Sequence, residues 1–394
     1  MAMLAATTML LAACSSDPQT ESGTPASTAS AEESSPHESP GSHASPQSPG
    51  EATAPEAPLR RGERFVDVAM PAAYTPKAPT TGTDDYRCFL LDPGLKKDAF
   101  VTGIDVVPDR AELVHHVILF RVPPPAVRTA RAHDAAEAGQ GWTCFGGSGL
   151  DGAGASLDDA PWIGAWAPGG GERVMAPDLG IPLVAGSRIV MQVHYNLLAG
   201  SGEDRSSARL RLAPGTKDLA PLETMLLPGP VELPCRPGVE GPLCQREAAV
   251  ADVKARFGAI TGQTADFLNL MCQGVGPSAV QSCSRPITER ATIRAVAGHM
   301  HLLGRKIKIE LNPGRDDART VLDIPVWNFD EQGSVPVDEP VEMVPGDELR
   351  VTCEHDQGLR DLLPVFEGQP ERYVVWGEGT TDEMCLGIVL VTRP

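Results

Sequence analysis

Residues Ser187–Leu197 read SRIVMQVHYNL, a short stretch in which apolar residues alternate with polar ones or follow one another directly. Stretches of this length that are rich in Val and Ile are typical of β-strands. Many such strands, separated by turn residues, favour β-sandwiches or barrels. Similar stretches, each bounded by Gly, Pro or Asp, follow Arg61 at Phe100–Val107, Leu113–Val122, Ala208–Leu212, Thr292–Leu302, Arg305–Leu311, Glu348–Cys353 and Leu386–Val391.

Two segments have a helical pattern instead, Ala126–Ala138 and Arg246–Ile260 with its continuation Thr264–Gln273. Both lie between strand-like stretches, so we expect short helical insertions in a β framework. The chain has 394 residues, with 40 Gly and 37 Pro, which suits two turn-rich domains. The sequence therefore predicts an all-β protein with two tandem antiparallel β-sandwich domains of jelly-roll type. We expect these domains at residues 62–220 and 221–394, with an insertion at residues 231–286.

The N-terminal segment has the features of an export signal. Residues 1–13 are almost all apolar or small and end at Leu11-Ala12-Ala13-Cys14, a pattern typical of bacterial lipoproteins, in which the cysteine is lipidated. Residues 14–61 are rich in Ser, Pro and Ala, with too little apolar surface to fold, and indicate a disordered tether that includes His37 and His43. We therefore expect an exported protein, anchored by its lipid alone to a bacterial membrane, at the outer membrane, the cell surface or the periplasm.

The charge balance argues against nucleic acid as a partner. The net charge is −19, and no basic stripe offsets it, so a phosphate backbone would be repelled.

The cysteines indicate disulfides. Eight of the nine remain when Cys14 is set aside, and an oxidising compartment keeps paired cysteines as disulfides. Eight cysteines permit 105 pairings, and the sequence alone fixes none of them. Within the insertion, proximity suggests the pairs Cys235–Cys244 and Cys272–Cys283.

Five of the nine histidines lie in three strand-like contexts: His115-His116, His194 and His299-Met300-His301. Imidazoles among apolar strand residues are costly unless they are hydrogen-bonded or bind a metal. The spacing of His299 and His301 places both rings on one face of a strand, as in a two-ligand pincer. His115 and His116 are adjacent and should point to opposite faces. They can share a metal only through a bulge, a strand end or different ring nitrogens, so a structural role stays open for this pair.

The surroundings of these histidines bear on the choice of metal. His194 shares its strand face with Gln192 and Asn196, which could hold the second N–H of a ligating imidazole. No carboxylate recurs beside the histidines, which argues against iron held by two histidines and a carboxylate. Imidazole with a possible thioether favours copper, and zinc is the competitor on histidine alone.

The three histidine motifs, in this order, resemble the copper type II, ascorbate-dependent monooxygenases, the family of peptidylglycine α-hydroxylating and dopamine β-monooxygenases. The resemblance covers roughly Val66 to Val391. It extends to Tyr86-Arg87-Cys88, Trp162–Ala167 followed by Gly180, Pro345-Gly346-Asp347, Cys353, and Gly377–Cys385.

The resemblance implies two copper ions. It assigns His115, His116 and His194 to an electron-transfer copper. It assigns His299, His301 and Met384 to the copper that binds O₂, where a soft thioether would stabilise Cu(I).

Further positions follow from the same resemblance. Tyr86 and Gln192 become candidates for residues that support the ligands. Two disulfides are implied, Cys88–Cys144 and Cys353–Cys385, the second fastening the turn with Met384 to a neighbouring strand. His133 and His355 match no ligand position, and we expect them to be exposed or hydrogen-bonded.

The implied activity is hydroxylation of an activated C–H bond of a small organic substrate, with O₂ and ascorbate or another one-electron reductant. Each copper would lie in its own domain, across a solvent-accessible cleft. The peptide hydroxylases bind the substrate carboxylate with an Arg and a Tyr where this chain has Ala297 and Ile388, which argues against a peptidylglycine substrate. The stretch His301–Lys306 is more similar to the dopamine β-monooxygenase branch.

Two other classes of function remain at this point. One is a copper-binding or storage lipoprotein without oxygenase activity, and the other is a structural or adhesive β-sandwich. The number of copper ions bound per chain distinguishes these two functions from the enzyme. Two ions per chain favour the enzyme, many weak sites favour storage, and none favours adhesion.

Overall fold

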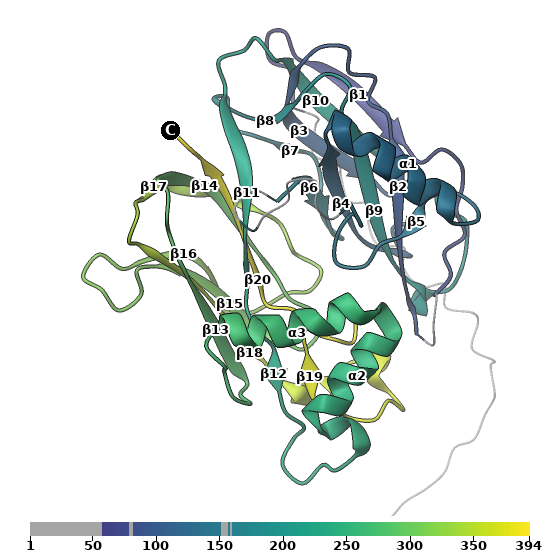
Figure 1. Ribbon diagram of the computed structural model, residues 1–394, viewed down its shortest axis with the longest axis vertical. Coiled ribbons are helices and arrows are strands. Elements are labelled where there is room, and N and C mark those ends of the chain that lie inside the picture. The colour runs from purple at the N-terminus through teal and green to yellow at the C-terminus, as the bar shows by residue number, and fades with distance from the viewer. Residues whose placement is uncertain (1–56, 79–81, 151–156, 158–159) are drawn as a thin grey trace, which may run out of the picture. The chain divides into compact units, whose positions relative to one another are not determined.

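The computed structural model describes residues 57–78, 82–150, 157 and 160–394 (Figure 1). The predicted signal peptide, Cys14, His37, His43 and the tether up to residue 56 lie outside the described residues. Strands dominate the described part, which confirms the predicted all-β sandwich architecture with short helices.

The first sandwich packs a five-stranded antiparallel sheet against part of a longer sheet. Apolar side chains from both sheets meet in one core, for example Phe89, Val101, Leu119, Ile181 and Leu210. The five-stranded sheet has the order β5 (Trp142–Thr143), β2 (Asp84–Leu91), β9 (Arg188–Asn196), β4 (Val114–Val122) and β6 (Trp162–Trp166). The facing strands are β1 (Arg64–Ala69), β10 (Ser207–Pro214), β3 (Ala99–Val107) and β8 (Leu179–Leu183), with β7 (Arg173–Val174) paired to β3.

The second sandwich uses the continuation of that long sheet. This continuation contains β11 (Ala220–Pro228), β20 (Leu386–Thr392), β14 (Ala291–His299) and β17 (Val335–Met343). The sheet facing it has the order β13 (Val280–Pro286), β18 (Glu348–His355), β15 (Gly304–Leu311) and β16 (Arg319–Ile324). Its core includes Ile293, Ile307, Val351, Val389 and Val391.

The two sandwiches are joined through β11, which pairs with β8 in parallel and with β20 in antiparallel fashion. The predicted boundary at residues 220 and 221 therefore falls at the start of a shared strand. A separate two-stranded sheet joins β12 (Glu232–Leu233) to β19 (Val374–Val375).

The helices lie where the sequence predicts them. They are α1 (Val127–Ala136), α2 (Arg246–Phe257) and α3 (Ala259–Met271). Gly258, with a φ of 91°, separates α2 from α3, a conformation that a residue with a Cβ rarely adopts. Short 3₁₀ turns occur at Pro124–Ala126, Leu197–Ala199, Pro242–Cys244, Gln357–Asp361 and Pro364–Phe366. Within the described residues, no helix combines the length and the apolar character needed to cross a membrane.

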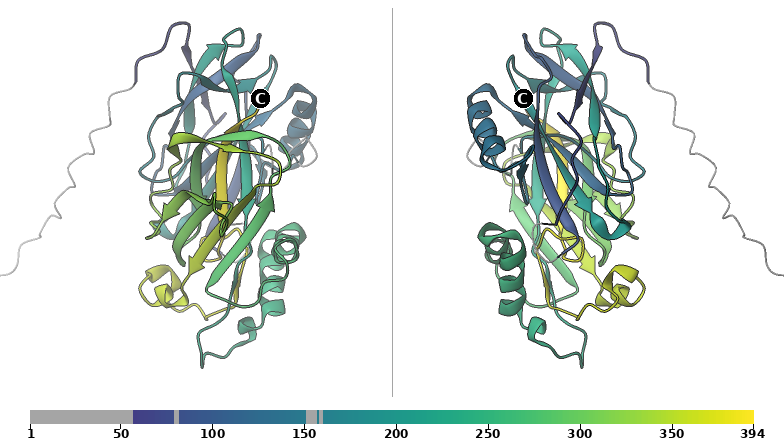
Figure 2. Two further views of the ribbon diagram at one scale, coloured as in Figure 1. Left: turned by 90° about the vertical axis from the view of Figure 1, so that its left-hand side faces the viewer. Right: turned by 90° about the vertical axis from the view of Figure 1, so that its right-hand side faces the viewer.

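The helices α2 and α3 form a pair at one end of the second sandwich (Figure 2). Val250 and Val253 of α2 and Leu268 of α3 are buried in one apolar cluster that also contains Trp376 and Met384. The insertion therefore packs against the segment that carries Met384.

All four predicted disulfides are present, which confirms both the implied pairs and the pairs suggested by proximity. They are Cys88–Cys144, Cys235–Cys244, Cys272–Cys283 and Cys353–Cys385.

Candidate metal centre

A β-bulge brings His115 and His116 to one site. In the pairing of β4 with β9, Val114 is opposite Tyr195 and His116 is opposite His194, so His115 is an extra residue without a partner in the register. A bulge bends the strand and redirects its side chains, which allows two adjacent residues to approach the same point. This is one of the conditions under which the sequence allows the pair to share a metal.

Three histidine nitrogens converge at the bulge. The Nδ1 atom of His115 lies 3.0 Å from that of His194 and 3.2 Å from that of His116, and the Nδ1 atoms of His116 and His194 are 3.4 Å apart. Three nitrogens that each lie about 2.0–2.1 Å from one ion would be separated by roughly 3.3–3.6 Å in tetrahedral or trigonal geometry. The observed distances of 3.0 to 3.4 Å lie at or slightly below the lower end of this range, and the three imidazoles are close enough together to hold one metal ion.

A carboxylate fixes the tautomer of His194. Its Nε2 atom lies 2.8 Å from Oδ1 of Asp84, which also accepts hydrogen bonds from the hydroxyl and the backbone N–H of Thr380 at 2.5 and 3.2 Å. Burial opposes ionisation of Asp84, but these hydrogen bonds outweigh it and lower the pKa of the carboxyl. His194 therefore donates from Nε2 and keeps its Nδ1 lone pair for a metal.

The three imidazoles are held neutral. Burial lowers the pKa of each ring, and the neighbouring histidines lower it further for His115 and His116, whereas Asp84 opposes the shift at His194. A buried neutral ring with a free lone pair is the form of histidine that binds a metal. The Nε2 atom of His115 is also buried and has no hydrogen-bond partner among the described residues.

Tyr86 packs directly against this site. Its ring stacks on that of His194, with centroids 3.9 Å apart and planes at 14°. Its hydroxyl donates to the backbone oxygen of Glu378 at 2.6 Å, so Tyr86 also links the first sandwich to the C-terminal segment.

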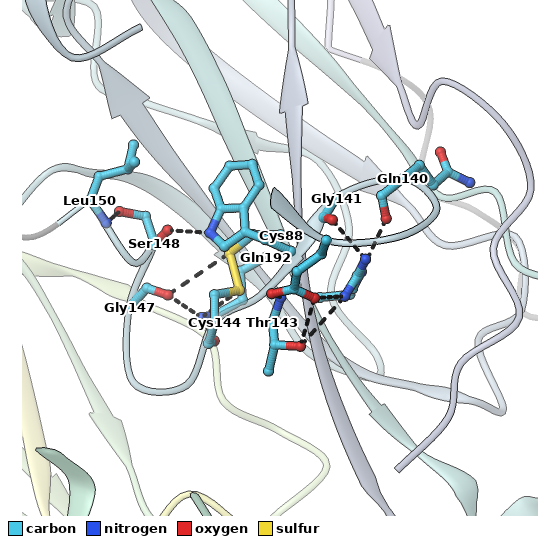
Figure 3. Close-up of a disulfide and its surroundings, with 12 residues drawn as sticks. Cys88, Gln140, Gly141, Thr143, Cys144, Gly147, Ser148, Leu150 and Gln192 are labelled. Carbon is cyan, nitrogen blue, oxygen red and sulfur yellow. Dashed lines mark hydrogen bonds and ion pairs between the residues drawn. A yellow bond between two sulfur atoms is a disulfide. The ribbon is translucent and has the colours of Figure 1, made fainter. Parts of the chain in front are cut away.

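Gln192 does not hydrogen-bond a histidine, in contrast to the expectation for its face of the strand. Its amide donates to the backbone oxygens of Cys144 and Gly147 at 2.9 and 2.7 Å (Figure 3). Residues two apart on a strand lie almost 7 Å apart, so Gln192 faces the Cys88–Cys144 disulfide while His194 faces the rings of His115 and His116. The acceptor for His194 is Asp84, 110 residues away in sequence, and no local pattern indicates this partner.

His299 and His301 form a second group at the end of β14. The strand ends at His299, so His301 lies just beyond it and not within the predicted strand, yet the two rings are 5.2 Å apart. The Nδ1 atom of His299 lies 2.5 Å from Oε1 of Gln332, and that of His301 lies 3.2 Å from the backbone oxygen of Asp382. Because both Nδ1 atoms face acceptors, both Nε2 atoms keep their lone pairs.

The protonation and burial of this pair also suit metal binding. Burial, reinforced by His301, lowers the pKa of His299 to about 3. The Nε2 atom of His301 is buried and has no hydrogen-bond partner among the described residues.

Several contacts fasten the turn that carries Met384. The carboxylate of Glu383 accepts hydrogen bonds from the backbone N–H groups of His301 and Leu303, at 3.0 and 2.5 Å. The Nε2 atom of His355 lies 3.2 Å from the backbone oxygen of Met384, so His355 is buried and hydrogen-bonded.

His133, by contrast, lies in α1 with its ring 6.0 Å from that of Trp142, away from both histidine groups.

Met384 lies two residues before the start of β20, the strand that pairs with the strand of His299. Leu386 is the register partner of His299, and Ile388 is that of Ala297. Met384 packs in one apolar cluster with Leu386 and Ile388 and is 7% exposed. Met384 therefore packs against Leu386, whose register partner is His299.

The two histidine groups adjoin one another. The rings of His116 and His299 are 5.8 Å apart, and the ring of His115 stacks on Phe329 at 4.5 Å. In the part of the chain that the structure describes, the two groups are therefore in contact, in contrast to the implied arrangement with a solvent-accessible cleft between them. Hydrogen bonds also hold the C-terminal half against the first sandwich next to these groups. They join Thr380 to Asp84 and the backbone oxygen of Glu378 to Tyr86.

A cavity of about 410 Å³ adjoins the second group. Ala297 and Ile388 form part of its wall, and Gln332 both lines it and accepts the hydrogen bond of His299. Most of the lining is apolar, and it includes Ile104 and Val106 of β3, Trp162 and Trp166 of β6, and Leu390 of β20. Its size and lining are those of a pocket for a small molecule.

Comparisons with known proteins do not identify a family. No family model matches the sequence, and no curated protein matches it. Solved structures with some similarity include the infectious bursal disease virus T13 particle (8% identity, TM-score 0.19, 87% of this chain and 72% of the other). They also include a fucolectin from striped bass, Morone saxatilis (9%, 0.14, 80% and 84%), and the coconut allergen cocosin (9%, 0.15, 84% and 86%). These TM-scores are too low to support any argument about function.

Proposed function

We propose that this chain is a copper-dependent monooxygenase that hydroxylates an activated C–H bond of a small organic substrate. The observation that carries the proposal is the pair of adjoining histidine groups beside an apolar cavity. Three Nδ1 atoms converge in one group, and in the other both Nδ1 atoms face acceptors, so that both Nε2 lone pairs are available to a metal. The different ligand sets fit two ions with different tasks.

The reaction would insert one oxygen atom of O₂ into the C–H bond and reduce the other to water, consuming two electrons and two protons supplied through a reductant such as ascorbate. Copper bound at the two groups would supply the redox chemistry. The first group would be His115, His116 and His194, and the second His299, His301 and Met384.

The protein's own residues prepare these groups. Asp84 and the backbone oxygen of Asp382 hold one ring nitrogen of His194 and His301, respectively, so that the other stays free. Glu383 holds the backbone of the His301 turn next to Met384. The apolar walls of the cavity would exclude bulk water and hold the substrate beside His299.

We further propose that the chain is exported and lipid-anchored through Cys14, in line with its N-terminal sequence. Binding of O₂, a reductant and a small substrate requires no nucleic acid or protein partner.

The test is O₂ uptake by the purified full chain, in detergent, loaded with two equivalents of copper and supplied with ascorbate and a panel of candidate substrates. We expect substrate-stimulated uptake and a hydroxylated product. Met384→Leu removes the thioether and keeps the side-chain volume, so uptake should be lost. Met343→Leu changes an equally buried methionine in β17 and should leave uptake unchanged. Failure to bind two coppers would exclude the proposal, whereas many weak sites would favour copper storage.

A further inference from the structure

Within the described part of the chain, the cavity contains one positive charge without a counter-ion. Arg173 in β7 lines the cavity, and its Nη1 group donates to the hydroxyl of Ser334 at 2.9 Å. Among the described residues, no carboxylate lies within ion-pair distance of its guanidinium. Burial alone lowers the pKa of Arg173, with no acidic side chain acting against it.

The other charged residues of the cavity are paired. Arg294 binds Asp178 at 2.6 Å, and Glu172 binds the buried Arg211 at 2.7 Å. Arg173 therefore differs from its neighbours. Burying part of a cation without an anion costs desolvation free energy. A ligand that brings a negative charge compensates this cost.

The guanidinium has room for such a ligand. Of its five N–H donors, Ser334 uses one. The planar group can bind a carboxylate through two parallel hydrogen bonds, which gives both strength and orientation.

The position of Arg173 relates it to the second histidine group. Ser334 contacts Arg173, and Gln332 contacts His299, so the two sites lie at opposite ends of one three-residue segment. The Cα atoms of residues 332 and 334 can be at most about 7 Å apart. A ligand that reaches both sites needs an apolar body of several bonds between its anionic end and the carbon beside His299.

We infer that the cavity binds an amphipathic organic acid, whose carboxylate is held by Arg173 and whose hydrocarbon body lies along the apolar wall. This inference rests on the proposed function in naming the class of its substrate. The net charge of −19 would repel an anion at long range, so a preference for acids must come from a local contact.

The experiment measures binding to the metal-free full chain, in detergent, by quenching of Trp162 and Trp166, which line the cavity. The probes are two matched pairs, 4-phenylbutyrate with 4-phenylbutyramide and octanoate with octanamide. The wild type should bind at least one acid about tenfold or more tightly than its amide, as expected for a charge-assisted hydrogen bond. Arg173→Met should abolish this preference and leave amide binding unchanged.

Arg294→Met is the matched control, because Arg294 lines the same cavity but is paired with Asp178. It should keep the preference for acids. If Arg173→Met does not fold, Arg173→Lys is the second test. It should bind the acid several-fold more weakly than the wild type, because the planar guanidinium with its two parallel donors is lost. Equal affinity for acid and amide in the wild type, or an unchanged acid affinity in the Arg173 variant that folds, would overturn the inference.

The outcome is independent of the monooxygenase assay. Preferential binding of acids without copper-dependent turnover would leave the inference standing and remove the proposed function. Copper-dependent hydroxylation without a preference for acids would support the proposed function and overturn the inference.

Discussion

The imidazole rings of His116 and His299 meet edge to face, with their centroids 5.8 Å apart and their planes at 87°. His116 projects from β4 of the first sandwich and His299 from the end of β14 in the second. Two histidine groups that are far apart in sequence are therefore in direct contact. If metals occupy both groups, an electron would cross a short path through packed side chains.

Removing one histidine of the first group should remove one metal. We expect His194→Ala to retain one copper per chain after dialysis where the wild type retains two, because two imidazoles hold an ion far more weakly than three. His133→Ala is the control, since His133 lies in α1 away from both groups. Copper per chain is measured by atomic absorption, and retention of two ions by His194→Ala would contradict the assignment of this ligand.

The carboxylate of Asp84, which accepts the Nε2 proton of His194, should strengthen copper binding at the first group. Asp84→Asn replaces the charged acceptor of the His194 Nε2 proton, and we expect copper affinity at the first group to fall about 10- to 100-fold. Asp85→Asn is a matched control, because Asp85 is the next residue of β2 and binds Tyr74 and the backbone of Lys77 instead. Competition with a chelator of known affinity measures both. Equal affinities in the two variants would show that Asp84 does not orient the ligand.

Glu378 should make stability depend on pH. Burial, reinforced by Asp382, raises the pKa of its carboxyl from 4.5 to about 7. Between these two values the folded state binds more protons than the unfolded state, so this group lowers stability as pH rises through that window. Above pH 7 the decrease in the free energy of unfolding caused by Glu378 is constant, at about 3 kcal/mol.

Glu378→Gln removes this loss while keeping the oxygen that accepts hydrogen bonds. The difference in unfolding free energy between the variant and the wild type should be near zero at about pH 4.5 and should favour the variant by about 3 kcal/mol at about pH 8. Urea unfolding at a series of pH values measures it. A difference that does not change with pH would show that Glu378 titrates alike in the folded and unfolded chains.

The disulfide beside Met384 should matter for both stability and metal binding. Cys353 and Cys385 are 32 residues apart, and Cys235 and Cys244 are 9 apart. From the closed loops, replacing each pair by serine should cost about 4 and about 3 kcal/mol, respectively.

Only the first replacement should weaken the second copper site, because Cys385 follows Met384 directly. Urea unfolding and copper titration of the two double variants measure both effects. A second site that is equally weakened by loss of Cys235–Cys244 would show that the effect is global.

The local sequence pattern determined the fold class, the positions of eight strands and those of the three α-helices. The period-two alternation that predicts strands depends only on neighbouring residues, and it located β3, β4, β9, β14 and β20 to within a few residues. Proximity in sequence also predicted the disulfides Cys235–Cys244 and Cys272–Cys283, since a short loop leaves few alternative pairings.

Tertiary structure decided how the histidines meet. His115 and His116 should point to opposite faces of a regular strand, and only the bulge against β9 brings them together. Gln192 shares a strand face with His194 and yet binds the loop at Cys144, whereas Asp84, from the neighbouring strand β2, binds the ring. Strand register and neighbouring strands are set by long-range packing, which no local pattern encodes.

The same reason applies to the cavity. Ala297 and Ile388 are apolar in the sequence, but only their pairing across β14 and β20 shows that they form one wall. Arg173 is one arginine among many in the sequence. Only the folded structure shows that it has no counter-ion among the described residues, because Glu172 and Asp178 are paired with other arginines.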